Sequence, residues 1–406
     1  MSKVVFFHTE RGYFSTGNLY LGSANLVDFY IYAGQHVSES VLMLPVMRNQ
    51  AAGRVSIPVP PAMEVRTLPY PEPEQGLVSK TGSLVSFIST LLNRKTLSTI
   101  SNADATVSAG LEFNGMMFGI ICSVVMKKKH AFIVRGNRLK TLKKSSRSLF
   151  SKLFARSRVR LYKGIMFYLL KRDRVQVWFQ GQEQYEVFSN VVGDRYSHSL
   201  YILNAALREL PEVTVTDNNE KPVMHNDLIY TGRITYEKGI KDLLDSIDLL
   251  LKSGRKVSAI IVGVGPYLEE AKALTKSLGL SELVHFAGYI NNVKELYSYV
   301  NNASIFVLPS HTEGLPRSML ESMASGTPVL VTDVGGIPYV IKDGVNGYLV
   351  KPSCPQCLAE KVATLLDQDG NERKKVVEKA RIDAKQFTFE ERSKVFLASI
   401  LDGNKS

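Results

Sequence analysis

Short apolar runs alternate with amphipathic segments along the chain, and the alternation is clearest in its second half. Apolar residues at helical spacing, such as Leu243, Leu244, Ile247 and Leu251, predict helices with one buried stripe. The predicted strands there are Leu228–Tyr230, Val257–Val262, Val284–Phe286, Ser304–Leu308, Val329–Thr332 and Tyr348–Val350. The predicted helices are Ile240–Lys252, Tyr267–Leu278, Val293–Val300, Ser318–Ala324, Pro338–Lys342, Cys357–Asp367 and Asn371–Ala384.

The first half shows the same alternation less regularly. Its predicted strands are Val4–His8, Val41–Leu44, Ala131–Val134 and Val175–Phe179, and one helix is expected to end near Ala33 and Gly34. A glycine-punctuated loop is expected over Thr9–Gly22, and the proline-rich residues 57–75 are expected to contain a loop with little regular structure. The polar stretch Leu210–Asn226 is a plausible linker.

Strand–helix alternation on both sides of a linker predicts an α/β protein with two Rossmann-like, doubly wound domains facing a central cleft. We expect these domains at residues 1–205 and 206–385, followed by a C-terminal helix in residues 386–406. Ligands of such folds sit beyond the carboxyl ends of the strands, so candidate chemistry is sought there.

Length and composition fit this organisation. The chain has 406 residues, 45% of them hydrophobic and 22% charged, which suits a soluble globular protein of two or three domains. Three cysteines are too few for a disulfide framework and suit a reducing compartment. The N-terminus has no signal-peptide pattern, so a cytoplasmic protein is expected. The apolar run Gly115–Met126 is shorter than a membrane-spanning helix and is expected to be a buried helix.

Positive charge is concentrated in one segment. The whole chain carries a formal charge of +12, yet residues 127–174 contain 17 Lys and Arg against the single acid Asp173. Within this segment, Ser145–Lys163 interleaves Leu and Phe with basic residues at near-helical spacing. This pattern fits a basic amphipathic helix on an anionic membrane surface, and equally a solvated helix over an ordinary core. No nucleic-acid-binding module accompanies the charge, so nucleic acid is not an expected partner.

The densest chemical signal follows the predicted strand Ser304–Leu308. Glu313, Gly314, Leu315 and Pro316 form a loop, and Glu321 lies in the helix that follows. The start of that helix offers free backbone N–H groups and a positive dipole end, which suit an anion. The two carboxylates can accept hydrogen bonds from sugar hydroxyls and from a ribose diol.

Three other loops follow predicted strands. In the first, Gly232 precedes Arg233 and Lys238, which together make a cationic cradle for a pyrophosphate. In the second, Gly263 and Gly265 form a turn that lacks the third glycine of the dinucleotide fingerprint. In the third, the main chain at Tyr289 and Ile290 could face a nucleobase.

Together these motifs resemble the retaining glycosyltransferases of family 4, which have the GT-B fold. The resemblance is strong over residues 228–350 and weaker over residues 1–205. It implies an N-terminal acceptor domain, a C-terminal nucleotide-sugar domain and a last helix that crosses back toward the first domain. Carried over by position, Arg233 and Lys238 would bind the donor pyrophosphate, and Glu313 would contact the donor sugar. Glu321 would hold the ribose, and Gly314 and Leu315 would offer main-chain N–H groups.

The resemblance implies sugar transfer with retention from a nucleoside-diphosphate sugar to a glycan or lipid-linked acceptor, without a metal or another cofactor. The only D-x-D sequence, Asp367-Gln-Asp369, follows a late helix far from the donor motifs, and we interpret it as a helix end. Cys354 and Cys357 have metal-like spacing but no second pair, so a packing role is expected.

The N-terminal half departs from the family pattern at one point. Arg135 stands roughly where family members often carry a histidine near the transferred sugar, and His130 and His8 are alternatives. Gly12 and Gly17 lie in the loop expected to face the cleft. Asn204 matches an asparagine near the interdomain hinge of the family.

Three other functions stay open at this point. One is a GT-B nucleotide-sugar epimerase or a phosphorylase, and another is a non-catalytic membrane-associated binding protein. The third is an NAD-dependent dehydrogenase, which the missing third glycine disfavours. The sequence identifies neither the donor sugar and its base nor the acceptor.

Overall fold

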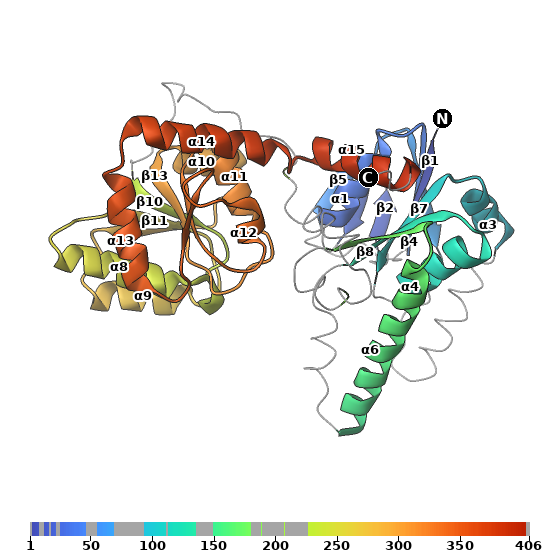
Figure 1. The fold of residues 1–406 in the computed structure, drawn as a ribbon, viewed down its shortest axis with the longest axis horizontal. Coiled ribbons are helices and arrows are strands. Elements are labelled where there is room, and N and C mark those ends of the chain that lie inside the picture. Colours follow the sequence, from blue (N-terminus) through green and yellow to red (C-terminus); the bar gives the residue numbers. More distant parts are fainter. Residues whose placement is uncertain are drawn as a thin grey trace. The chain divides into compact units, whose positions relative to one another are not determined.

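The structure is a computed structural model. It describes residues 2–7, 12–15, 18–21, 25–45, 55–68, 93–110, 113–134, 149–179, 188, 207 and 226–402. The chain divides into two compact units, which Figure 1 shows as two bodies of ribbon. The N-terminal unit combines Met1–Asn204 with Phe389–Ser406, and the C-terminal unit is Ala205–Thr388. The expected linker Leu210–Asn226, except for its last residue, lies outside the described residues, as does Asn204.

The N-terminal unit is built on a six-stranded sheet in the order β6-β4-β1-β7-β8-β9. All five strand pairings are parallel. The strands are β1 (Lys3–Phe7), β4 (Glu39–Pro45), β6 (Met63–Leu68), β7 (Ala105–Gly110), β8 (Lys129–Val134) and β9 (Val175–Phe179). Its helices include α1 (Asn25–Gly34), α3 (Arg94–Ser101), α4 (Phe113–Ile120) with the π-turn Ile121–Val125, and α6 (Leu149–Leu170).

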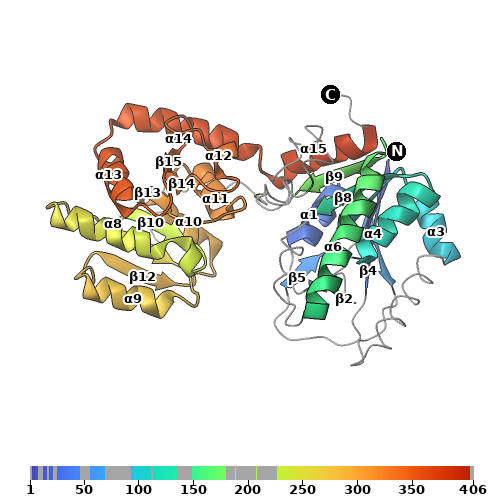
Figure 2. The ribbon, with the colours of Figure 1, turned by 60° about the horizontal axis from the view of Figure 1, so that its bottom comes forward.

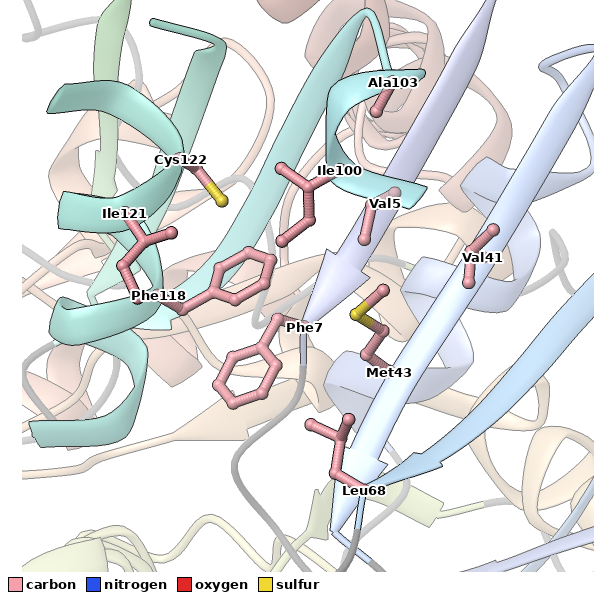
Figure 3. Close-up of a cluster of buried hydrophobic side chains, with 10 residues drawn as sticks. All are labelled: Val5, Phe7, Val41, Met43, Leu68, Ile100, Ala103, Phe118, Ile121 and Cys122. Carbon is pink, nitrogen blue, oxygen red and sulfur yellow. The ribbon is translucent and has the colours of Figure 1, made fainter. Parts of the chain in front are cut away.

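Apolar side chains from three strands and two helices form one core of this unit. Figure 3 shows Phe7 and Phe118 facing each other between β1 and α4, with ring centroids 4.6 Å apart. The buried cluster contains Val5, Phe7, Val41, Met43, Leu68, Ile100, Ala103, Phe118, Ile121 and Cys122. The run Gly115–Met126 is thus helical and largely buried, because it supplies one wall of this core.

One expectation for the first half is wrong. The predicted loop Thr9–Gly22 contains β2 (Gly12–Ser15) and β3 (Asn18–Leu21), which pair antiparallel, and β3 also pairs with β5 (Val55–Pro58). Residues 57–75, which were expected to contain a loop, include the end of β5 and all of β6, and residues 69–75 lie outside the described residues. Pro58 is the last residue of β5, and β6 itself contains no proline.

The last helix, α15 (Phe389–Asp402), packs on the N-terminal unit. Phe29 of α1 meets Phe389 and Phe396 edge-on, at centroid distances of 5.8 and 5.5 Å. Trp178 of β9 contacts Phe396 in the same way at 5.2 Å. Figure 1 shows this helix in red beside the blue α1. Apolar contacts therefore tie the end of the chain to its first unit.

The C-terminal unit contains a second parallel sheet in the order β12-β11-β10-β13-β14-β15. Its strands are β10 (Asn226–Thr231), β11 (Ala259–Val262), β12 (Val284–Gly288), β13 (Ala303–Leu308), β14 (Val329–Thr332) and β15 (Tyr348–Val350). Its α-helices are α8 (Ile240–Lys252), α9 (Leu268–Ser277), α10 (Val293–Asn301), α11 (Arg317–Ser325), α12 (Ile337–Val340), α13 (Pro355–Leu366) and α14 (Gly370–Lys385). In both ribbon views α8 and α9 lie on one side of the sheet and α11 and α14 on the other (Figures 1 and 2).

Two doubly wound, Rossmann-like sheets confirm the predicted fold class. In the second unit every predicted strand is present, and each predicted helix matches an observed one within a few residues. Along the sheet the chain moves from β10 to β11 and β12 in one direction, and from β13 to β14 and β15 in the other. The order reverses between β10 and β13, and in open α/β sheets ligands bind outside the carboxyl ends of the strands at such a point.

Candidate functional site

The loops after β10 and β13 meet at this reversal, and their backbones are in direct contact. Gly239 closes the short 3₁₀ turn Tyr236–Lys238 with a φ of 70°, in the left-handed region that favours glycine. A Cβ atom at Gly239 would lie 1.9 Å from the Pro309 carbonyl oxygen. The His311 N–H also donates to the Glu237 carbonyl oxygen at 2.8 Å. Only glycine at this position lets the two loops approach so closely.

An ion pair joins the same two loops. Lys238 Nζ lies 2.6 Å from Glu313 Oε1, and Ser310 Oγ donates to that oxygen at 2.7 Å. The Glu313 side chain is 7% exposed and that of Lys238 is 25% exposed. The sequence expected both residues at the site, and the structure brings them into contact. The pair places one positive and one negative group beside each other at the carboxyl edge of the sheet.

The loop after β14 holds Glu313 from the other side. A Cβ atom at Gly335 would lie 1.9 Å from the Glu313 carbonyl oxygen, and Gly336 N–H donates to the Gly314 carbonyl oxygen at 2.8 Å. The Thr332 hydroxyl donates to the Ser310 carbonyl oxygen at 2.6 Å. Contacts from the last residue of β14 and from the loop that follows it therefore hold the backbone that carries Glu313.

The helix α11 begins directly after this loop. Its N-cap position is Pro316, and no side chain in the described part of the chain caps it. The first N–H groups of α11 are therefore available to an anion, and the helix dipole favours negative charge there. Leu315 is buried, whereas a Cβ atom at Gly314 would have nothing within 4 Å. The backbone at Gly314 is thus open on the side where a side chain would stand.

Glu321 lies in the second turn of α11. Its Oε1 is 3.6 Å from Arg317 Nη2, and its side chain is 22% exposed. Burial raises the pKa of Glu321, and the positive charge of Arg317 partly offsets that effect. Among the described residues no group donates a hydrogen bond to this carboxylate, so ligand hydroxyl groups could serve as its donors.

Arg233 is exposed in the loop after β10. Tyr230 anchors this loop, because its hydroxyl donates to the Arg233 carbonyl oxygen at 2.8 Å. Burial, together with the charges of Glu313 and Glu237, raises the pKa of Tyr230, so the hydroxyl keeps its proton. The guanidinium of Arg233 thus projects from a loop whose backbone is fixed.

The loop after β10 and the loop after β11 pack backbone against backbone, because glycines stand at their contacts: Gly232, Gly263 and Gly265. A Cβ atom at Gly263 would lie 1.8 Å from the Gly232 carbonyl oxygen, and one at Gly265 would lie 2.1 Å from that of Ile234. Beyond them, Tyr289 follows β12 with 72% exposure and Ile290 is half-buried. All these residues follow parallel strands, so they share the carboxyl edge of the sheet with Lys238 and Glu313.

Sequence reasoning missed part of this arrangement. His311 Nε2 lies 2.9 Å from Asp242 Oδ2, and this contact joins the loop after β13 to the first turn of α8. His311 lies in the motif that contains Glu313, but Asp242 is 69 positions away from it and outside that motif, so nothing in the sequence indicates their pairing. Ser310 was within reach of prediction, since it lies three residues before Glu313 at the end of a strand.

The described part of the N-terminal unit does not bring the candidate acceptor residues together in one site. His130 is 1% exposed, with Nδ1 2.8 Å from Thr106 Oγ1 and Nε2 3.0 Å from Ser108 Oγ. Burial lowers its pKa to about 3, so the ring is neutral and hydrogen-bonded within the sheet. The structure therefore does not support His130 as a cleft residue. Gly12 begins β2, and His8, Gly17 and Arg135 lie outside the described residues.

No group of three His, Cys, Asp or Glu residues that could hold a metal ion occurs among the described residues. The D-x-D carboxylates have structural partners. Asp367 accepts from both Arg255 Nη atoms at 2.6 and 2.8 Å, and Asp369 caps α14 by accepting from Asn371 N–H.

Comparisons with known proteins show which sequences and folds this chain is similar to. Residues 214–383, less than half of the chain, match the family model "Glycosyl transferases group 1". The uncharacterized glycosyltransferase MJ1607 of Methanocaldococcus jannaschii is 35% identical over 158 residues, 38% of this chain and 39% of that protein. The capsular polysaccharide biosynthesis glycosyltransferase CapM of Staphylococcus aureus is 28% identical over 162 residues, 38% of this chain and 42% of CapM. The chain thus spans about two fifths of the length of these relatives.

A solved structure extends the likeness to both units. Anabaena Alr3699/HepE in complex with UDP has a TM-score of 0.57 and 17% identity, with coverage of 98% of this chain and 100% of that chain. At this identity the likeness concerns the fold, which is GT-B.

The close approach of the two loops generates a test. Gly239 and Gly279 both have a φ of +70°, but a Cβ atom at Gly279 would have nothing within 4 Å. Gly279→Ala is expected to cost about 1–2 kcal/mol of unfolding free energy for the left-handed backbone alone. Gly239→Ala is expected to cost about 1–3 kcal/mol more, because the methyl group overlaps the Pro309 carbonyl. Urea unfolding followed by circular dichroism measures both, and equal losses would contradict the account.

Proposed function

We propose that this chain is a glycosyltransferase that moves a sugar from a nucleoside-diphosphate sugar, with retention, to a glycan or lipid-linked acceptor. The observation that carries the proposal is the Lys238–Glu313 pair, which precedes the uncapped N-terminus of α11 at the reversal of the sheet. Cations and free N–H groups suit a diphosphate, and a carboxylate beside them suits sugar hydroxyls.

Each group has a distinct part in the proposed reaction. Arg233, Lys238 and the first N–H groups of α11 bind the diphosphate and stabilise the charge that develops on it as it leaves. Lys238 exchanges part of its contact with Glu313 for a phosphate oxygen, and Glu313 then accepts a hydrogen bond from the donor sugar. Glu321 accepts from the ribose hydroxyls, and the main chain at Tyr289 and Ile290 flanks the base.

The chemistry needs little acid–base catalysis from the protein. The bond between the anomeric carbon and the phosphate oxygen breaks, and the acceptor hydroxyl oxygen bonds to that carbon on the same face. The acceptor proton passes to the departing phosphate oxygen. The proposal assigns charge stabilisation to side chains and backbone N–H groups, without a metal or another cofactor.

The donor class is supported by HepE, whose fold resembles this one and whose structure contains UDP. Surface polysaccharide assembly as the setting is supported by CapM, whose name refers to capsular polysaccharide. A nucleotide-sugar epimerase or a phosphorylase would use the same loops. Release of nucleoside diphosphate only when acceptor is present would separate transfer from both.

Removal of the Arg233 guanidinium tests the proposed diphosphate role. Arg233→Ala is expected to lower kcat by more than about tenfold, by analogy with the loss of one oxyanion donor. The assay follows UDP release from UDP-glucose with a lipid extract of the source organism as acceptor, and repeats it with other nucleotide sugars.

Arg255→Ala is the matched control, since Arg255 pairs with Asp367 and precedes β11, at the opposite edge of the sheet. Equal kcat values in the two variants would remove Arg233 from the proposed mechanism.

We further propose that α6 docks the protein on an anionic membrane, at the cytoplasmic face where the acceptor would be made. The helix turns one face inward through Met166, Leu169 and Leu170, which are buried in the core. Arg160, Leu161, Gly164, Phe167, Tyr168 and the following Lys171 are exposed and recur at helical spacing. Lys171 Nζ lies 4.2 Å from the centre of the Phe167 ring.

This exposed stripe combines cations with large apolar side chains, as interfacial helices do. Leu161 is 58% and Tyr168 is 56% exposed. Figure 1 shows the helix in green, extending well beyond the sheet of its unit. No described helix is long and apolar enough to cross a membrane.

Charge reversal on this stripe tests the membrane proposal. Arg160→Glu with Lys171→Glu is expected to weaken binding to phosphatidylglycerol vesicles by about thirtyfold or more, since each basic residue near such a surface contributes about 1 kcal/mol. Lys374→Glu with Lys375→Glu makes the same charge change on exposed residues of α14 and should have little effect. Vesicle sedimentation measures both, and equal weakening in the two variants would contradict docking through α6.

A further inference from the structure

Cys354 and Cys357 form a disulfide at the start of α13, after β15. The expectation that these cysteines only pack was wrong. The third cysteine, Cys122, is free and buried in the core of the other unit, where burial raises its pKa to about 12. Of the three cysteines, Cys354 and Cys357 are therefore the pair that solvent can reach, since both are partly exposed.

This disulfide contributes less to the stability of the fold than one that closes a long loop. It joins residues only three positions apart, so the loop that it closes is short and the unfolded chain loses little freedom. The helix α13, whose first turn contains Cys357, is held by its own apolar face. The buried residues of that face are Leu358, Ala359, Val362 and Leu365. The bond can therefore open without removing the contacts that keep α13 in place.

The helix start favours one sulfur as a thiolate. Cys354 is the N-cap residue of α13, and its Sγ accepts a hydrogen bond from the Cys357 N–H at 3.3 Å. Pro355 occupies the first turn and lacks an N–H group. The positive end of a helix dipole, with an N–H group directed at the sulfur, stabilises negative charge on Cys354. A thiolate stabilised in this way is also a good leaving group in disulfide exchange.

We propose that Cys354 and Cys357 are a reversible thiol–disulfide exchange site, opened by a dithiol reductant. The reductant thiolate attacks Cys357 Sγ, a mixed disulfide forms there, and Cys354 leaves as the thiolate. The second thiol of the reductant then attacks its own sulfur in the mixed disulfide, releases Cys357 and becomes a disulfide. Two electrons and two protons pass to the pair. This proposal does not rest on the proposed glycosyltransferase activity, so either of the two can be overturned while the other stands.

The first test uses the full chain under native conditions. The oxidised protein is incubated with dithiothreitol at a few millimolar, alkylated with iodoacetamide and mapped by peptide mass spectrometry. Cys354 and Cys357 are expected to become alkylated while Cys122 stays unmodified and the circular dichroism spectrum is unchanged. A pair that opens only in denaturant, or a spectrum that collapses on reduction, would overturn the proposal, because the disulfide would then be structural.

Two single variants test the assigned roles. In Cys357→Ser the remaining Cys354 thiol is expected to react with iodoacetamide at pH 7 about threefold or more faster than Cys357 does in Cys354→Ser. Equal rates, or a faster Cys357, would overturn the role of the helix start. Reduced glutathione in place of the dithiol should leave a mixed disulfide on Cys357, which distinguishes a monothiol source from a dithiol source.

Discussion

The candidate site depends on the contact between the backbone at Gly239 and the carbonyl of Pro309. The sheet order makes β10 and β13 neighbours, so the loops that follow them emerge side by side. Their backbones can meet only because Gly239 has no side chain and adopts a left-handed conformation. This contact lets Lys238, at the end of one loop, reach Glu313 in the other.

The electrostatics of the site follow from this geometry. A mostly buried carboxylate needs partners, and Glu313 obtains them from Lys238 and the Ser310 hydroxyl. In the proposed function, this ion pair already holds Lys238 beside the position assigned to the diphosphate. Glu321 differs, since burial raises its pKa and Arg317 compensates only in part. Hydroxyl donors from a ligand would stabilise this second carboxylate, and for this reason the proposed ligand carries both negative charge and hydroxyl groups.

The sequence predicts the second unit closely because strands such as β11 and β14 are buried along their whole length. Such strands appear as continuous apolar runs, and Ile240–Lys252 was predicted with both helix bounds correct. The first unit was harder, since β7 carries Thr106 and Ser108, whose hydroxyl groups contact the buried His130. A buried polar cluster of this kind leaves no hydrophobic signal. The β2–β3 hairpin was missed because its glycines are also typical of a loop.

At the candidate site, residues in short sequence motifs were predicted, whereas contacts between residues far apart in the sequence were not. Lys238, Glu313 and Glu321 lie in short motifs that carry their own chemical meaning. The pairing of His311 with Asp242 arises only when α8 and the loop after β13 come together, so it needs coordinates. The disulfide also lay beyond the sequence, because the spacing of Cys354 and Cys357 suits metal binding, packing and bonding alike.

The most direct test of the account is a calorimetric titration of the protein with UDP, GDP, ADP and CMP, repeated on Glu321→Ala. The matched control is Glu282→Ala, since Glu282 is exposed and precedes β12 at the opposite edge of the sheet. The account predicts that one diphosphate binds in the micromolar range. Glu321→Ala should weaken that binding by about tenfold to a hundredfold, because hydrogen bonds to a charged group are lost, while Glu282→Ala leaves it unchanged. Binding of none of the four nucleotides, or equal binding to both variants, would contradict the donor site.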